Sequence, residues 1–208
     1  MEDVLDLYAE AYAPQRPWVC FDEKPYQRLS HQREPLPMAP GKPLRIDYEY
    51  RREGTCNLFQ IFDPHRAWRH IEVTERRTAV DFAQQMKWLV EEAYPEAEII
   101  RVVLDQLNTH TLGSLYEAFA PEEARRIARR LEFHYTPKHA SWLNMAETEF
   151  SVLERQCLNR RLGSLEEVRR ESGAWTDTRN QAGATVHWRF NLEKAHTKMH
   201  RFYPSQSL

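Results

Sequence analysis

This chain of 208 residues has little cysteine and glycine and lacks any long apolar run. Its three cysteines lie far apart, and their odd number argues against a disulfide framework and against a Cys-x-x-Cys zinc site, so we expect them to be buried apolar residues. No apolar run approaches the roughly 20 residues that a membrane helix needs. The N-terminus lacks the basic start and the apolar stretch of a signal peptide. We therefore expect a cytoplasmic protein without a membrane span.

Net charge does not indicate a nucleic-acid partner either, because it is only −2. The arginines are distributed unevenly, since six pairs of adjacent arginines occur along the chain, at 51–52, 76–77, 125–126, 129–130, 160–161 and 169–170. Pairs gathered on one face could contact phosphates. For most pairs we favour the alternative of solvated helix faces balanced by nearby glutamates.

The composition, with 41% hydrophobic and 29% charged residues, is typical of a globular domain. A short apolar strand is expected at 18–21, stopping at Asp22, and a proline-rich irregular loop at 24–42. A β-hairpin is expected within 55–74 and an amphipathic helix at 78–94. A second buried strand, at 98–105, again ends on an aspartate. This order predicts an α/β fold with a mixed sheet.

A right-handed crossover between the two buried strands would set them side by side and parallel. Asp22 and Asp105 would then meet at the carboxyl edge of the sheet, where open α/β sheets place their ligands. Two like charges held so close are costly unless a cation lies between them, and carboxylate oxygens favour Mg²⁺ or Mn²⁺. For each aspartate taken alone we favour the explanation of a strand-end turn residue, but we interpret the pair as a metal site.

A third carboxylate would complete a site for two ions. Further helices are expected at 112–119, 121–131 and 164–180, and a helix opened by Ser141 is expected at 141–158. The core stripe expected for that last helix consists of Trp142, Leu143, Ala146, Phe150, Leu153 and Cys157. Glu147 and Glu154 fall on one flank of the stripe and Glu149 on the other, so spacing alone does not choose between them.

Three segments carry a family resemblance when they are taken together and in order. They are CFDEK at 20–24, VLDQLNTH at 103–110 and YTPKHASWLNMAE at 135–147. Together they resemble the three catalytic blocks of the bacterial insertion-sequence branch of the mariner-type transposases, and the resemblance covers nearly the whole chain. Each block alone is a weak signal, whereas three blocks in order are a specific one.

The resemblance implies an RNase H-like fold with a mixed central sheet and helices on both faces. It implies a DDE-type catalytic triad of Asp22, Asp105 and Glu147, where Glu147 is chosen because it follows Trp-Leu-Asn-Met-Ala as the family motif requires. The triad would hold two Mg²⁺ ions, for which Mn²⁺ substitutes. Water would cut the DNA at the element's end, and the freed 3′-hydroxyl would attack target DNA.

The resemblance also suggests a division of the chain and its partners. We expect an N-terminal helix and linker at 1–17, the catalytic domain at 18–180 and a basic helical tail at 181–208. Family members carry an N-terminal helix-turn-helix region, which we expect to be separate or missing because Asp22 comes so early. The expected partner is DNA, and the chain is expected to form a homodimer and to associate with the bacterial nucleoid.

Six residues near the three blocks are candidate DNA contacts, namely Lys24, Asn108, His110, Lys138, His139 and Asn144. Five of them have another explanation as well. The two lysines could be ordinary surface residues, Asn108 could cap a turn, and either histidine could orient a carboxylate.

Two features depart from the family pattern. Gln106 replaces an asparagine that often follows the second aspartate, and 41 residues separate Asp105 from Glu147, more than is usual. Two alternatives therefore stay open. The chain could be an inactive remnant that acts by dimerisation or DNA binding, or an RNase H-like nuclease that cuts hybrid or branched nucleic acids.

Overall fold

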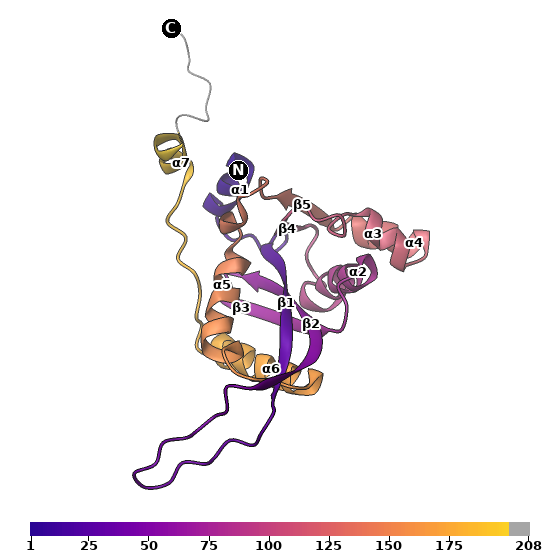
Figure 1. Ribbon diagram of the computed structural model, residues 1–208. Coiled ribbons are helices and arrows are strands. Elements are labelled where there is room, and N and C mark those ends of the chain that lie inside the picture. Colours follow the sequence, from indigo (N-terminus) through magenta and orange to yellow (C-terminus); the bar gives the residue numbers. More distant parts are fainter. Residues whose placement is uncertain (200–208) are drawn as a thin grey trace.

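The structure, a computed structural model, describes residues 1–199; residues 200–208, the end of the expected tail, lie outside the described part. One mixed sheet runs through the molecule in the order β3-β2-β1-β4-β5 (Figure 1). Its strands are β1 (Trp18–His31), β2 (Tyr50–Asp63), β3 (Trp68–Thr74), β4 (Ile100–Leu104) and β5 (Leu131–Tyr135). β1 is antiparallel to β2 and parallel to β4, so the mixed α/β sheet and the parallel pairing of the two buried strands are confirmed.

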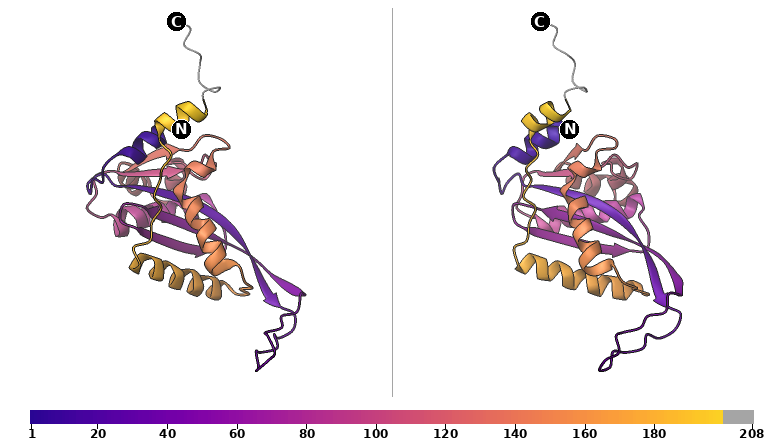
Figure 2. Two further views of the ribbon diagram at one scale, coloured as in Figure 1. Left: turned by 90° about the vertical axis from the view of Figure 1, so that its left-hand side faces the viewer. Right: turned by 60° about the vertical axis from the view of Figure 1, so that its left-hand side comes forward.

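Helices cover both faces of this sheet (Figure 2). One face carries α2 (Ala79–Trp88), α3 (Gly113–Ala118) and α4 (Pro121–Ala128). The other face carries α1 (Glu2–Ala9), α5 (Met145–Leu153) and α6 (Leu165–Gln181). Short π-helical segments, Leu89–Ala93 and Glu154–Leu158, follow α2 and α5, and a 3-10 turn, Ser141–Leu143, precedes α5. α7 (Leu192–Lys198) packs beside α1 through an apolar contact.

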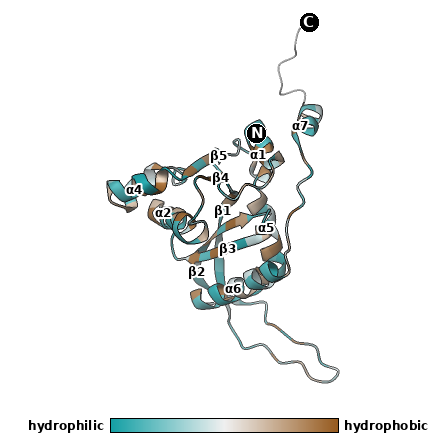
Figure 3. Ribbon diagram, turned by 180° about the vertical axis from the view of Figure 1, so that it is seen from behind, coloured by the Kyte–Doolittle hydropathy of each residue, from teal (hydrophilic) through white to brown (hydrophobic). Residues whose placement is uncertain are grey.

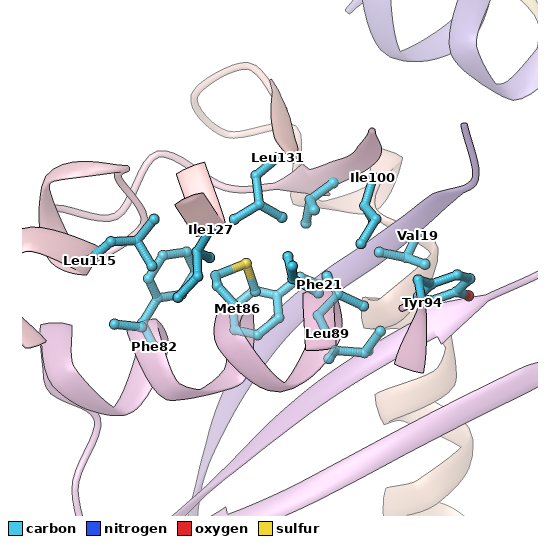
Figure 4. Close-up of a cluster of buried hydrophobic side chains, with 14 of the residues drawn as sticks. Val19, Phe21, Phe82, Met86, Leu89, Tyr94, Ile100, Leu115, Ile127 and Leu131 are labelled. Carbon is cyan, nitrogen blue, oxygen red and sulfur yellow. The ribbon is translucent and has the colours of Figure 1, made fainter. Parts of the chain in front are cut away.

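The larger hydrophobic core lies between the sheet and α2, α3 and α4 (Figure 4). Val19 and Phe21 of β1 face Phe82 and Met86 of α2, which recur at the helical spacing that the sequence predicts. Burial of each such side chain contributes roughly 1.5–3 kcal/mol. The first turn of α2 is fixed by a capping box, in which the side chain and backbone of Thr78 bond reciprocally with Asp81.

The opposite face of the sheet packs against α5 and α6. Cys20 of β1 packs in one cluster with Met145 and Ala146 of α5. Leu58 of β2 packs in another with Phe150 and Leu153 of α5 and with α6. In Figure 3 these helices carry apolar and polar residues on different sides, as amphipathic helices do. All three cysteines are buried and free, as expected. In the described part of the chain, no helix is long and apolar enough to cross a membrane.

β1 is much longer than the sequence predicts. We expected it to stop at Asp22, but it continues to His31 because it pairs with β2 from Cys20 to His31. Beyond Cys20 no residue of β1 pairs with β4. One side of the strand is therefore open, and Pro25 is tolerated there. The irregular loop is consequently displaced to residues 32–49 and projects from the end of the sheet between β1 and β2 (Figure 1).

The start of α5 also differs from the expectation. Asn144, not Ser141, caps the helix, because its side-chain Oδ1 accepts a hydrogen bond from the backbone nitrogen of Ala146 at 3.1 Å. The preceding turn is a 3-10 turn. Trp142 in that turn is 42% exposed and lies outside the core stripe in which we expected it.

The outer edge of β3 is covered by side chains of α6. Asn180 accepts a hydrogen bond from the backbone nitrogen of Arg69 and donates one to the carbonyl oxygen of Arg69, each at 2.9 Å. The guanidinium of Arg169 donates to the carbonyl oxygen of Val73. Three backbone groups of this edge strand, two on Arg69 and one on Val73, therefore have partners from α6.

Candidate active site

Asp22 and Asp105 lie in one row across the sheet. Cys20 of β1 pairs with Val103 of β4 in the parallel ladder. Asp22 lies two residues beyond Cys20, and Asp105 lies two residues beyond Val103, just after β4 ends. Because side chains alternate along a strand, both carboxylates belong to the face that α5 covers. The strand pairing thus brings together two residues that are more than eighty positions apart.

The start of α5 lies over the same row. The Asn144 side chain donates a hydrogen bond from Nδ2 to the carbonyl oxygen of Phe21, the residue before Asp22, at 2.8 Å. One turn later, Glu147 lines a cavity of about 280 Å³ together with Asp22 and Lys24. The Oε2 atom of Glu147 is buried and has no hydrogen-bond partner among the described residues. The first helical turn therefore contributes a third carboxylate beside Asp22.

The choice between the glutamates of α5 is clear in the structure. Glu149 faces away from Asp22, towards β3 and α6, where its carboxylate lies 3.2 Å from Nε of Arg69 and 2.8 Å from NH2 of Arg179. Glu154 forms an ion pair with Lys24. Among these three glutamates, Glu147 is the one that lines the cavity with Asp22.

Asp22 is poised to exchange a proton near neutral pH. The pKa of its carboxyl group is raised to about 7, chiefly by burial and also by the charges of Asp105 and Glu147, whereas the hydrogen bond from the backbone nitrogen of Glu23 and the charge of His110 oppose the shift. That bond joins Glu23 N to Oδ1 of Asp22 at 2.8 Å. The mutual repulsion indicates that the three carboxylates are close enough to act on one another.

Asp105 is held by a histidine. Nδ1 of His110 lies 2.5 Å from Oδ1 of Asp105, and Nε2 of the same ring lies 3.6 Å from Oε2 of Glu23. The ring packs edge-on against Phe21 and tilted against Phe82. Burial alone would lower the pKa of His110, but the hydrogen bond with Asp105 and the nearby carboxylate of Glu23 outweigh it and raise the pKa to about 9. In return, the His110 bond overcomes the effect of burial and lowers the pKa of Asp105.

Two further residues belong to this network and were not anticipated from the sequence. Glu23 is almost completely buried and also binds NH1 of Arg77 at 3.0 Å, so it joins His110 to a half-exposed arginine. Both residues line a cavity with Asn108. The signal for Glu23 was its position next to Asp22, since adjacent strand residues point to opposite faces.

The residues expected to contact DNA fall into two groups. Lys138 and His139 line a cavity of about 290 Å³ with Asp105, while Lys24 and Asn108 line the neighbouring cavities. His110 and Asn144 do not fit that expectation, because they are 0% and 2% exposed. Nδ1 of His110 binds Asp105, and both amide atoms of Asn144 bind backbone groups.

Gln106, which departs from the family pattern, turns away to the neighbouring loop. Its side-chain nitrogen donates to the carbonyl oxygen of Thr136 at 3.3 Å. The longer side chain thus ties the loop after β4 to the loop after β5, and it still lines two of the cavities around the site.

The donor set fits hard divalent cations, since carboxylate oxygens are the groups that Mg²⁺ and Mn²⁺ prefer. As the side chains are oriented here, no group of three or more His, Cys, Asp or Glu residues within 1–199 is arranged to hold a metal ion. The buried Oε2 of Glu147, which lacks a partner, and the mutually repelling carboxylates of the row are nevertheless the features that a cation would relieve.

Comparisons with known proteins agree with this geometry. The chain matches the family model described as DDE superfamily endonuclease over residues 17–169. No curated protein matches it. A structure titled as the Mos1 mariner paired end complex with Mn is similar, with 18% identity, a TM-score of 0.55 and coverage of 86% of this chain. The Mos1 Strand Transfer Complex is similar too, with 17% identity, a TM-score of 0.57 and the same coverage.

The chain spans 54% of the length of each of these two Mos1 chains. At such low identity the likeness concerns the fold, and it confirms the RNase H-like arrangement of a mixed sheet with helices on both faces. The family match, in contrast, covers about three quarters of the chain. The chain belongs to the DDE superfamily of endonucleases.

Proposed function

We propose that this chain is the catalytic domain of a DNA transposase, which cuts DNA at the ends of a mobile element and joins them to target DNA. The observation that carries the proposal is the convergence of Asp22, Asp105 and Glu147, from three separate elements, at one rim of the sheet. Membership of the DDE superfamily endonucleases supports this reaction class. The likeness to Mos1 structures titled as paired-end and strand transfer complexes supports DNA as the substrate.

In this proposal, Asp22, Asp105 and Glu147 hold two Mg²⁺ ions, for which Mn²⁺ substitutes. When bound, such ions lower the pKa of an attacking water and stabilise the charge on the leaving oxygen. The protein's own residues keep two of the carboxylates in place. His110 fixes Asp105 by a hydrogen bond, and Asn144 fixes the start of α5, and with it Glu147, against β1.

The DNA would lie across the cavities that surround the row. Lys24 and Lys138 are placed to contact phosphates, and His139 and Asn108 are placed beside them. Arg77 is a further candidate, because its half-exposed guanidinium lies beside Asn108. His110 and Asn144 act inside the protein in this scheme.

Several finer features follow from the family resemblance and form part of the same proposal. They are a homodimer, a bacterial origin with action at the nucleoid, and a helix-turn-helix region outside residues 1–208. The division at 1–17, 18–180 and 181–208 stays a prediction.

A nicking assay on supercoiled plasmid DNA tests the function. The chain should nick DNA when Mn²⁺ or Mg²⁺ is present and should stop when EDTA is added. Asp22→Asn, Asp105→Asn and Glu147→Gln should each reduce nicking to background, while Glu166→Gln, a surface carboxylate on α6, should leave it unchanged. Nicking that survives all three substitutions at the site would overturn the proposal.

The same assay separates the two alternatives. A folded chain that binds DNA or forms dimers but never nicks would identify an inactive remnant. Faster cleavage of RNA–DNA hybrids or branched substrates than of duplex DNA would identify an RNase H-like nuclease that acts on hybrid or branched nucleic acids.

A further inference from the structure

Gln60 occupies an unusual position in the middle of β2. Its side chain is 0% exposed, and neither its amide nitrogen nor its amide oxygen has a hydrogen-bond partner among the described residues. Buried polar groups in folded proteins are nearly always paired, because an unpaired one costs free energy. An amide left in this state indicates a bond that forms in another state of the protein.

The strand register identifies the group that this amide can reach. Gln60 lies directly opposite Asp22 in the antiparallel pair of β1 and β2. Side chains of residues that oppose one another in this way lie on the same face, with Cβ atoms about 4.5–5.5 Å apart. The neighbours of Gln60 at alternate positions, Leu58 and Phe62, pack in the clusters under α5 and α1. Gln60 thus extends the row of Asp22 and Asp105 by one strand.

Two charged residues on this face, Arg69 and Glu149, already have partners. Arg69, diagonally across from Gln60 on β3, is paired with Glu149, and Glu149 also binds Arg179. Asp22 is different. Its Oδ1 accepts a hydrogen bond from the backbone of Glu23, and no donor within residues 1–199 bonds to Oδ2. Asp22, which has an unused acceptor, and Gln60, which has unused donors, are therefore neighbours.

We propose that Gln60 is a positioning residue for Asp22, in which the amide NH₂ donates a hydrogen bond to the Asp22 carboxylate and fixes the orientation in which it binds a divalent cation. A neutral amide suits this task, because a lysine or arginine here would bring a positive charge that repels the cation. The geometry of the two strands supports the hydrogen bond. Only the role in cation binding rests on the proposed function.

The hydrogen bond is tested by NMR of the whole ¹⁵N-labelled chain. Gln60→Met identifies the side-chain NH₂ signals of Gln60 by their loss. In an otherwise unchanged chain, Asp22→Asn should shift these signals, whereas those of Gln156, whose oxygen accepts a bond from Trp175, should stay in place. Gln60 signals that are indifferent to Asp22→Asn and to added Mg²⁺ overturn the proposal.

The consequence for cation binding is tested with Mn²⁺ and electron paramagnetic resonance. Gln60→Met keeps the volume of the side chain and removes an unpaired polar group, so the melting temperature should stay equal or rise. The Mn²⁺ affinity should fall by about tenfold, as is typical when a group that orients a metal ligand is lost. Equal Mn²⁺ affinity overturns the positioning role. If the unaltered chain binds no Mn²⁺, the proposed function fails instead, and the NMR result still decides whether Gln60 bonds to Asp22.

Discussion

Nδ1 of His110 lies 2.5 Å from Oδ1 of Asp105, so a fully buried imidazole holds the second carboxylate of the row. Its other nitrogen faces the almost completely buried carboxylate of Glu23. With its pKa raised to about 9, the ring is positively charged at neutral pH. The protonated ring of His110 thus gives Asp105 a compensating positive charge. It bonds only to Oδ1 of Asp105, and Oδ2 has no bond to His110.

Replacing His110 by glutamine should lower metal-dependent nicking by about 10–100-fold, because Asp105 loses the group that orients it. The measurement is the nicking rate as a function of Mn²⁺ concentration. His134→Gln is a suitable control, since His134 on β5 contacts Asp3 and Glu132 rather than the row. Equal rates for the chain with and without His110 would contradict the role of this residue.

The stability of the metal-free chain should fall as pH rises. The folded pKa of Asp22 is about 7 against an ordinary 3.8, and that of His110 is about 9 against 6.5. Between each pair of values the folded state binds more protons than the unfolded state, so the free energy of unfolding decreases with pH. Urea unfolding at several pH values measures the decrease. Asp22→Asn should remove the decrease in stability that occurs below pH 7, and His110→Gln should remove the decrease that occurs above pH 6.5. If both variants show the same dependence of stability on pH as the unaltered chain, the pKa shifts are contradicted.

Added Mg²⁺ should reverse this trend. A cation binds the ionised carboxylate of Asp22, whose pKa is about 7, so binding competes with a proton in mildly acidic solution and proceeds freely in mildly alkaline solution. The rise in melting temperature caused by Mg²⁺ should therefore be larger at a pH above 7 than below it. Glu147→Gln should abolish most of the rise at either pH, and an equal rise in that variant would argue against Glu147 as a ligand.

Two neighbouring glutamates of α5 should respond in opposite ways. Glu149→Gln removes the partner of the buried Arg69 guanidinium, and such a loss lowers the free energy of unfolding by about 3–5 kcal/mol. Glu147→Gln should leave stability equal or higher, because Oε2 of Glu147 has no partner to lose. Denaturant unfolding of the two variants measures the contrast. A greater loss for Glu147→Gln than for Glu149→Gln would reverse the assignment.

The sequence predicted that Asp22 and Asp105 lie side by side because the pairing of parallel strands follows a simple rule. Two parallel neighbouring strands bring equivalent positions side by side, and Asp22 and Asp105 each lie two residues beyond the paired Cys20 and Val103, although β1 continues past Asp22. The length of β1 was missed because Pro25 and the polar residues after it resemble a loop. Their pairing with β2 depends on a partner some thirty residues away.

Side-chain partnerships were less predictable than the row itself. The spacing of Glu147 and Glu149 on a helix is nearly symmetric about the core stripe, and only the position of Arg69 on β3 separates them. Gln60 did leave a signal, since it interrupts the apolar alternation of Leu58 and Phe62 on a buried strand. The burial of His110 left no such sign in the sequence.

The contact between α6 and β3 has a consequence for how copies of this chain can assemble. An exposed edge strand is a template on which another polypeptide can add a strand, which is a common route to aggregation. The amide of Asn180 imitates a peptide group and occupies both hydrogen-bonding positions of Arg69. A foreign strand would first have to displace that side chain. Assembly by continuation of the sheet is therefore disfavoured on this side of the molecule.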